Sequence, residues 1–372
     1  MTPELDYITV KGFKSIASVE KLRLTPINVV IGPNGAGKSN LIEVFSFLHA
    51  IREGHLDDYV RRAGGAEKLL HFGSKVTDRI EIHISFSDEV NQYKLTLTPT
   101  AEDGLYPAGE AACYWNKRYT LPYESSLSSR SGGREAGISG ADLKGGADWV
   151  RHRLGGWRLY HLHDTSSSSL MRKTARIHDN RFLRPEGANL PAFLYLLQEK
   201  YPDHYRSIRR TVRMTAPFFE DFHLEPDPLN EETIRLAWKH KGSDQYFDAS
   251  NLSDGTLRFI ALATLFLQPE LFLPSVILVD EPELGLHPHA ITLLASMVED
   301  VSSKAQVILS TQSSLLLDNF SPNDVLVADR VDESTQFRRL DPGKLESWLE
   351  EYSPGQLWEK NELGGRPGGA VH

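Results

Sequence analysis

Apolar and polar positions along the chain predict strands followed by helices at both of its ends. Short apolar, β-branched runs at residues 7–13, 27–31, 275–280 and 306–309 are typical of buried strands. Apolar side chains at helical spacing follow the second and third runs, at Leu41, Val44, Phe45 and Leu48 and at Leu294, Met297, Val298 and Val301. The pattern indicates an α/β fold assembled from two distant parts of the chain.

The region between these parts has a more varied pattern. Residues 79–87 alternate strictly between apolar and polar, and residues 93–97 repeat the pattern after a short polar turn, which predicts a hairpin. Residues 157–163 predict another strand. Residues 189–214 predict two helical segments broken near Pro202.

A Gly- and Ser-rich segment at residues 124–147 interrupts these elements. It has too little apolar surface to offset the entropy lost on ordering, so we expect a mobile loop or linker. The long interval between Ser39 and Ser253 lacks sustained heptads. We therefore expect a compact inserted lobe there, and no long coiled coil.

The composition is that of an ordinary soluble globular protein, with 372 residues, 40% hydrophobic and 24% charged. The net charge of −9 argues against a general affinity for nucleic acid but leaves room for a local basic patch. The single cysteine, Cys113, excludes an internal disulfide framework. No signal peptide and no apolar run of about 20 residues is present, so we expect a cytoplasmic protein without a membrane span.

The stretch "GPNGAGKS" between a predicted strand and a predicted helix has the form of a P-loop. Its glycines allow backbone N–H groups to surround phosphates, and we expect Lys38 to reach the β- and γ-phosphates of ATP and Ser39 to ligate Mg²⁺. A chance glycine-rich turn is the alternative. The predicted nucleotide-binding residues here are Gly32, Pro33, Asn34, Gly35, Ala36, Gly37, Lys38, Ser39 and Asn40.

Two adjacent acids, Asp280 and Glu281, end the apolar run at 275–280. Carboxylates at the end of a buried strand are costly unless they serve a cation or a reaction. Asp280 suits the Mg²⁺ site, and Glu281 suits a base that polarises the water attacking the γ-phosphate. The alternative is a strand end with solvated acids.

A third motif, "LSDGTLR", places Ser253 and Gly255 directly before a predicted helix, about 20 residues ahead of the strand that carries Asp280. A helix N-terminus suits phosphate, although a simple N-cap is the competing interpretation. The position is that of the signature motif of ABC-type ATPases. Such a motif closes over the ATP that a second protomer binds.

These motifs together resemble those of the SMC/RecF-type ABC ATPases, in the subgroup related to the ATPase half of OLD-family nucleases. The matching stretches are "GFKSI", "GPNGAGKSN", "LSDGTLR", "DEPELGLHP", "STQS" and "NELGGRP", and the resemblance is good over residues 1–90 and 250–320. It implies an α/β P-loop NTPase: an ABC-ATPase head of mixed sheet with flanking helices and a compact inserted α+β lobe. ATP and Mg²⁺ are the implied ligands.

The resemblance also implies a division of the chain. Residues 1–98 and 235–330 would form the head, residues 99–234 the inserted lobe, and residues 331–372 a C-terminal extension. ATP would clamp two heads into a homodimer. Each composite site would use Lys38, Ser39, Asp280 and Glu281 of one protomer and Ser253 and Gly255 of the other.

Two positions depart from the pattern of transporter ATPases. His287 stands where those proteins carry an aspartate, and Gln312 stands where they carry the switch histidine. By resemblance Gln312 is the γ-phosphate sensor, able to donate an amide N–H but without a titratable charge. We therefore expect slow or differently regulated hydrolysis. A buried structural amide is the alternative.

Two further features leave alternatives open. His161, His163 and Asp164 follow or end a predicted strand and are compatible with a metal site, although they also fall where ABC ATPases carry the Q-loop. A basic helical face is formed by Arg206, Arg209, Arg210 and Arg213. It predicts contact with a polyanion or an acidic partner, and a solvated helix face is the alternative.

Three functions fit the resemblance: an ATP-dependent switch that controls a separate effector in bacterial defence, a RecF-like DNA-repair clamp, or a non-catalytic ATP-dependent scaffold. About 50 residues follow Asn319, too few for the nuclease domain of OLD proteins, so we expect a separately encoded nuclease or toxin-like partner. Asp329 and Asp332 are interpreted as solvated turn residues. Trp348 and Trp358 are candidate anchors for the partner, or pack on the chain's own head.

Overall fold

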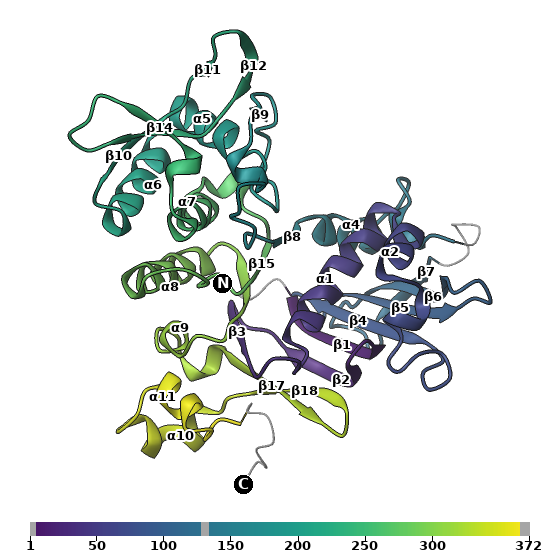
Figure 1. Cartoon of the computed structure of the whole chain (residues 1–372). Coiled ribbons are helices and arrows are strands. Elements are labelled where there is room, and N and C mark those ends of the chain that lie inside the picture. The colour runs from purple at the N-terminus through teal and green to yellow at the C-terminus, as the bar shows by residue number, and fades with distance from the viewer. Residues whose placement is uncertain (1–4, 128–133, 365–372) are drawn as a thin grey trace.

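A six-stranded, mostly parallel sheet forms the centre of the molecule (Figure 1). The structure, a computed structural model, describes residues 5–127 and 134–364. The strand order is β18-β17-β3-β16-β15-β8, and β18 alone is antiparallel to its neighbour. The strands span Ile27–Ile31 (β3), Trp157–Tyr160 (β8), Val276–Asp280 (β15), Gln306–Ser310 (β16), Val325–Val331 (β17) and Ser334–Arg339 (β18).

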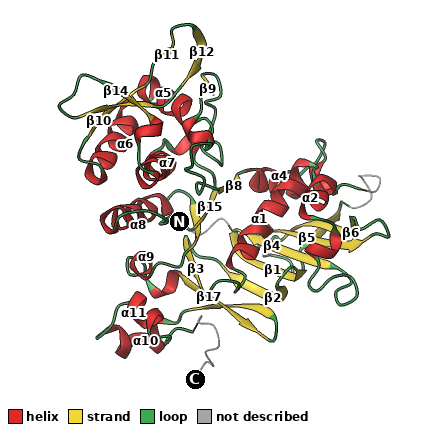
Figure 2. Ribbon diagram, viewed as in Figure 1, coloured by secondary structure: helices red, strands yellow, loops and turns green. Residues whose placement is uncertain are grey.

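Both faces of the inner strands β3, β15 and β16 are buried, which is why these strands are mostly apolar. Successive side chains of β3 enter opposite cores: Val29 lies in one hydrophobic cluster and Val30 in the other. Helix α1 (Lys38–Glu53) covers the face of Val30, and α7 (Asp254–Leu267) and α8 (Pro288–Ser302) cover the face of Val29 (Figure 2). The predicted α/β arrangement of distant chain segments is confirmed.

A second, antiparallel sheet packs beside α1. Its order is β2-β1-β4-β5-β6-β7, and the predicted hairpin is the β4–β5 pair. The strands are Leu5–Phe13 (β1), Ile16–Arg23 (β2), Ile80–Phe86 (β4), Asn91–Pro99 (β5), Leu105–Tyr114 (β6) and Tyr123–Ser126 (β7), and the helices near them are Leu56–Ala63 (α2), Ala66–Leu69 (α3) and Gly146–Gly155 (α4).

The described parts of the Gly- and Ser-rich segment, residues 124–127 and 134–147, have regular structure and buried contacts, contrary to the loop that composition predicts. The segment begins within β7, and Leu127 and Ile138 are buried. The buried Glu110 carboxylate accepts backbone hydrogen bonds from Gly137, at 2.5 Å, and from Ile138, at 2.8 Å. A few apolar side chains and one buried acceptor therefore order a polar sequence. Residues 128–133 of the segment lie outside the described ranges.

A smaller lobe stands above α7 (Figure 1). The predicted helix break is confirmed, because α5 ends at Lys200 and Pro202 opens α6, where a missing N–H costs nothing. Helix α6 packs against α7. The lobe's elements are Leu190–Lys200 (α5), Pro202–Thr215 (α6), Ala175–Arg176 (β9), Phe219–His223 (β10), Pro226–Asp227 (β11), Asn230–Ile234 (β12), Ala237–His240 (β13) and Tyr246–Asp248 (β14).

The strands within residues 99–234 join more than one part of the molecule. β6 and β7 extend the antiparallel sheet, and β8 closes one edge of the central sheet. In the same way β18, within residues 331–372, pairs with β17. The division into head, lobe and extension stays a prediction.

In the C-terminal segment, α11 (Pro354–Glu359) packs against α9 (Ser314–Leu317), and Leu345 and Leu349 of α10 (Pro342–Leu349) pack against the core that contains α7. Trp358 packs against the core that contains α7, whereas the side chain of Trp348 is 43% exposed. The prediction that Asp329 is a turn residue is wrong. Asp329 lies within β17, after the apolar residues that begin this strand. Asp332 does lie in the exposed turn after that strand. In the described ranges, no helix is long and apolar enough to cross a bilayer.

Candidate nucleotide-binding site

The carboxyl ends of the parallel strands meet at one edge of the central sheet, and the predicted site residues follow those ends. The P-loop follows β3, Asp280 ends β15, and Gln312 lies two residues after β16. In open α/β sheets such an edge is where ligands bind. The fold thus brings together residues that are more than 240 positions apart in the sequence.

The P-loop leaves the N-terminus of α1 open. Gly37 adopts φ 95° as the N-cap, and no side chain caps the helix, so its first N–H groups have no intrahelical partner. The Lys38 ammonium donates to the carbonyl oxygens of Gly32, at 2.7 Å, and Pro33, at 3.2 Å. Burial lowers the pKa of Lys38, and the charges of Glu281, Asp280 and Glu283 oppose that shift.

Other residues of the predicted loop hold its shape. Ala36 is buried in the core, and the Asn40 amide donates to the Ser15 hydroxyl at 2.6 Å. The Ser15 hydroxyl is also 2.6 Å from that of Thr335. A Cβ on Gly37 would collide with both hydroxyls, whereas a Cβ on Gly35 would meet no atom within 4 Å. The loop is therefore closed on its protein side and open at Gly35.

The two predicted magnesium ligands face each other. The Ser39 hydroxyl lies 3.5 Å from the Asp280 carboxylate, whose other oxygen accepts from the Ser310 hydroxyl. A hydroxyl and a carboxylate beside a phosphate-binding loop are oxygen ligands of the kind that Mg²⁺ takes. The residues fit a Mg²⁺ ion bound together with nucleotide phosphates.

Glu281 and Gln312 also meet: the Gln312 amide donates to the Glu281 carboxylate. Gln312 is exposed, which is contrary to the alternative of a buried structural amide. Glu281 adopts a left-handed φ of 40°, which is uncommon for a residue other than glycine. Strained backbone of this kind is often found where a side chain must be aimed at a ligand.

Glu283 is a residue of this site that the motif did not single out. It is 8% exposed, and one carboxylate oxygen accepts both the Thr311 hydroxyl and, at 3.2 Å, the Gln312 backbone N–H. Burial raises the pKa of Glu283. Glu283 thus fixes the turn that presents Gln312. A second acid in "DEPE" was the available signal, but only the fold shows what that acid contacts.

The signature residues stand on the opposite face of the sheet. Ser253 caps α7, with its hydroxyl accepting from the Thr256 backbone N–H at 3.2 Å. A Cβ on Gly255 would collide with the carbonyl oxygen of Gly285, in the turn that follows Glu281. Within the described ranges, no hydrogen bond joins Ser253 or Gly255 to the chain's own P-loop.

The histidines after β8 do not form the metal set considered above. β8 ends at Tyr160, so His161 and His163 lie in a loop. Across the part of the chain that the structure describes, no group of three His, Cys, Asp or Glu side chains is arranged to hold a metal ion. His163 instead lies near the acids: burial lowers its pKa, and the charge of Asp280 opposes the shift.

Comparison with known proteins agrees with this arrangement. A profile of the family described as "AAA domain, putative AbiEii toxin, Type IV TA system" matches residues 27–318, most of the chain. The chain belongs to this family. The match runs from β3 to α9 and so includes the P-loop, the signature, the two acids and Gln312.

Curated relatives match over shorter stretches. The chromosome partition protein Smc of Mycobacterium tuberculosis is 38% identical over 98 residues, which is 25% of this chain and 8% of that protein. The DNA double-strand break repair Rad50 ATPase of Saccharolobus solfataricus is 35% identical over 80 residues, 21% of this chain and 9% of that protein. The chain thus covers less than a tenth of either relative.

Solved structures share the fold over nearly the whole chain. An Smc head bound to the C-winged helix domain of ScpA aligns with a TM-score of 0.59 at 16% identity, covering 92% of this chain and 99% of that one. An Smc head with an extended coiled coil, bound to the C-terminal domain of ScpA derived from Pyrococcus furiosus, gives 0.56 at 15% identity, covering 94% and 99%. The predicted SMC/RecF-type ABC ATPase fold is confirmed, and the relation to OLD nucleases stays a prediction.

The basic helix of this family member is α6, and part of its charge is neutralised within the chain. Arg206 pairs with Asp203, Arg209 lies 2.5 Å from Asp221, and Arg213 donates to a backbone carbonyl. Arg210 is exposed and forms no hydrogen bond or ion pair with another described residue. A shallow hollow on this helix is lined by Asp203, Arg206, Ser207, Arg209, Arg210 and Arg213.

Proposed function

We propose that this chain is an ATP-dependent switch, in which two copies close around two ATP molecules and hydrolysis opens them again. One observation carries the proposal. The phosphate loop, the Ser39–Asp280 pair and the Glu281–Gln312 pair share one edge of the sheet, while Ser253 and Gly255 stand apart on α7. The first set suits binding and attack, and the second set suits a nucleotide held by another copy.

The binding half of the site has a clear division of roles. The N-terminus of α1 supplies N–H groups and favourable potential to the phosphates, and Lys38 exchanges its loop carbonyls for phosphate oxygens. Ser39 and Asp280 would hold Mg²⁺. The ion, when bound, offsets charge on the β- and γ-phosphates.

The reacting half consists of Glu281 and Gln312. Glu281 would accept a hydrogen bond from the attacking water and draw its proton, and Gln312 would donate its amide N–H to a γ-phosphate oxygen. In the structure the amide is paired with Glu281. The amide has a second N–H that can reach a γ-phosphate oxygen while the first holds Glu281, so phosphate sensing is linked to the base. We expect slow turnover because the amide carries no titratable charge.

The output of the switch is proposed to be a separately encoded effector, a nuclease or toxin-like protein, in bacterial defence against phage. The description of the family, which refers to an AbiEii toxin, supports this direction. The Smc heads in two solved structures are bound to ScpA, which illustrates that heads of this fold carry partner proteins. A repair clamp and a non-catalytic scaffold remain the competing functions.

The test compares the wild type with Lys38→Ala and Glu281→Gln. We expect multiple turnovers of ATP in the wild type, and an ATP-dependent dimer of Glu281→Gln on gel filtration with stalled turnover. Equal turnover in wild type and Glu281→Gln would refute the role of the base. Absence of turnover would favour the scaffold. Copurification with the products of neighbouring genes would identify the effector, whereas tight binding to gapped DNA without a partner would favour the repair clamp.

A further inference from the structure

Residues 161–172, after β8, run from the edge of the sheet that carries the P-loop to the signature loop. Helix α7 forms hydrogen bonds to the first residues of this segment. The segment starts at His161, directly after Tyr160, and Tyr160 pairs with Val279, the residue before Asp280. The Arg258 guanidinium of α7, which is buried, donates to the carbonyl oxygens of Leu162, at 3.0 Å, and His163, at 2.8 Å.

The middle of the segment is held by its own hydrogen bonds. The Asp164 carboxylate accepts from the Ser166 backbone N–H, at 3.1 Å, and from its hydroxyl, at 2.6 Å. The Ser169 hydroxyl donates to the Asp164 carbonyl oxygen at 2.6 Å, and Met171 is fully buried. The serine-rich stretch is therefore an ordered connection.

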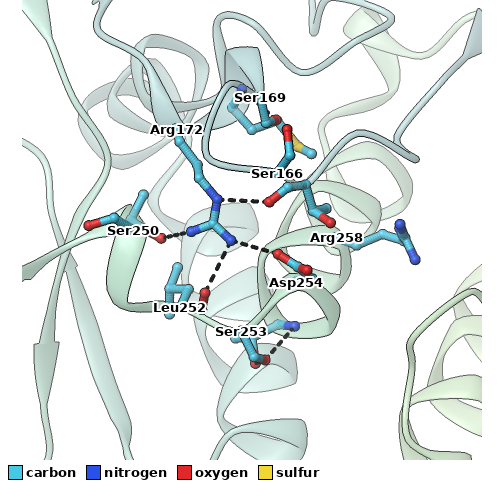
Figure 3. Close-up of polar contacts among 12 residues, drawn as sticks. Ser166, Ser169, Arg172, Ser250, Leu252, Ser253, Asp254 and Arg258 are labelled. Carbon is cyan, nitrogen blue, oxygen red and sulfur yellow. Dashed lines mark hydrogen bonds and ion pairs between the residues drawn. The ribbon is translucent and has the colours of Figure 1, made fainter.

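Arg172 ends this segment and holds the signature loop (Figure 3). Its Nε donates to the Thr165 carbonyl at 2.9 Å, which keeps the guanidinium in one orientation. Its two terminal nitrogens donate to the Ala249 carbonyl, to the Leu252 carbonyl at 3.2 Å and to the Asp254 carboxylate at 2.9 Å. These three acceptors span the residues that lead into Ser253 and Gly255.

The chemistry of these contacts requires arginine. The side chain is 8% exposed and uses nitrogens in a rigid fork, which a lysine ammonium cannot reproduce. The Asp254 partner is 67% exposed, so the ion pair alone would contribute little. The charge-assisted bonds to two backbone carbonyls are what fix the loop, because they define where its main chain lies.

We propose that Arg172 is a positioning residue for the signature loop, residues 249–255, and that it acts on the nucleotide bound by the partner copy. Arg172 also connects that loop to residues 161–172, which begin beside Asp280 and Glu281. The nucleotide site of each protomer is thereby linked through hydrogen bonds to the signature loop that contacts the partner copy. The inference rests on the proposed composite site and adds to it the residue that holds the signature loop in place.

The first test is Arg172→Gln, with Arg172→Lys as the conservative variant. We expect ATP binding by each protomer to stay near wild type, since Arg172 does not contact the P-loop. Turnover, and ATP-dependent dimerisation in a Glu281→Gln background, should fall about tenfold or more, as expected for losing charge-assisted bonds of about 1.5–3 kcal/mol. Arg172→Lys should recover only part of the loss. Wild-type turnover and dimerisation in Arg172→Gln, or a loss of ATP binding by the single protomer, would overturn the proposal.

The deciding test is complementation. Arg172→Gln mixed with Lys38→Ala should regain turnover, because the intact P-loop of the first meets the intact signature of the second in one site of the mixed dimer. Arg172→Gln mixed with Ser253→Arg should not, since both defects lie on the signature side. A protein that merely misfolds would not be rescued by Lys38→Ala.

Lys38→Ala mixed with Ser253→Arg serves as the reference pair. If that pair regains turnover while Arg172→Gln with Lys38→Ala does not, Arg172 does not act through the signature and this inference fails alone. If the reference pair also fails, the composite site is wrong, and the proposed function and this inference fail together.

Discussion

The N-termini of α1 and α7 pack against opposite faces of one sheet, and they are built in opposite ways. Helix α1 begins at a glycine with no side-chain cap and no acid in its first turn. Helix α7 begins at Ser253, whose hydroxyl caps it, and has Asp254 in its first turn, paired with Arg172. One terminus leaves its N–H groups available to a ligand, and the other already has internal partners.

The difference gives the two termini complementary roles in the proposed composite site. At α1 the unpaired N–H groups and the open loop favour phosphate directly. At α7 the charge of Asp254 is offset by Arg172 and the backbone is held still, so what the helix offers is a fixed surface. In the proposed dimer, this fixed surface meets the nucleotide that the other copy binds.

Lys38→Ala and Ser253→Arg should separate the two termini most sharply. Removing the ammonium should weaken ATP binding about a hundredfold, the effect of losing charged hydrogen bonds of up to about 3 kcal/mol. Ser253→Arg should leave ATP binding to single protomers unchanged and prevent closure and turnover. Nucleotide titration and gel filtration measure the two effects. Normal turnover by Ser253→Arg alone would show that α7 has no role in trans.

Gln312 variants test the part of the site that lies beside Glu281. Gln312→Ala should keep ATP binding and lower turnover about tenfold, the loss of one hydrogen bond to a charged group of about 1.5 kcal/mol. Gln312→His restores a donor and should give a rate different from that of the alanine variant. Steady-state kinetics with separate KM and kcat distinguish the cases. Wild-type rates in both variants would make Gln312 structural.

Glu283 lies in the turn after β15, and Glu283→Gln should change how the stability of the protein depends on pH. Because burial raises the pKa of Glu283, its contribution to the free energy of unfolding is fully present below the ordinary glutamate pKa and is lost as the pH rises through the raised value. Glu283→Gln cannot titrate. In denaturant titrations it should match the wild type in acid and exceed it toward neutral pH.

The activity of the same variant provides the control. The side-chain amide that Glu283→Gln introduces has a carbonyl oxygen that can still accept from Thr311 and from the Gln312 backbone, so turnover should be kept. Glu283→Ala has no such acceptor and should lose turnover. A stability difference that is independent of pH would contradict the assignment.

The smallest effect is expected on α6. Arg206→Glu with Arg210→Glu should weaken binding of a polyanion or acidic partner several-fold and reduce its dependence on salt, because two cationic contacts are lost. ATP binding should not change, since α6 packs on the α7 side of the sheet. A matched control is Arg61→Glu with Arg62→Glu on α2, beside the other core. An unchanged salt slope would indicate a solvated helix face.

Features whose interactions lie within a few residues could be predicted from the sequence, and features that depend on distant partners could not. The P-loop glycines, the adjacent acids and the strand of residues 306–309 are each recognisable within a few residues, and the fold places them as expected. Glu283 was missed because its partners are 28 and 29 residues away, and Arg172 because its acceptors on the signature loop are 77 to 82 residues away. The prediction for residues 124–147 failed in their described parts because composition cannot show that Glu110 will accept hydrogen bonds from Gly137 and Ile138.

The place of β3 in the sheet has a consequence for how the chain is made. All five residues of this strand are buried, and its two neighbours, β16 and β17, begin at Gln306 and Val325. A ribosome adds roughly 5–20 residues per second, so the strand is synthesised many seconds before either neighbour exists. The P-loop is then completed by Thr335, later still. During synthesis the P-loop therefore lacks its contact with Thr335, and β3 lacks both strand neighbours, until about 300 further residues have followed it.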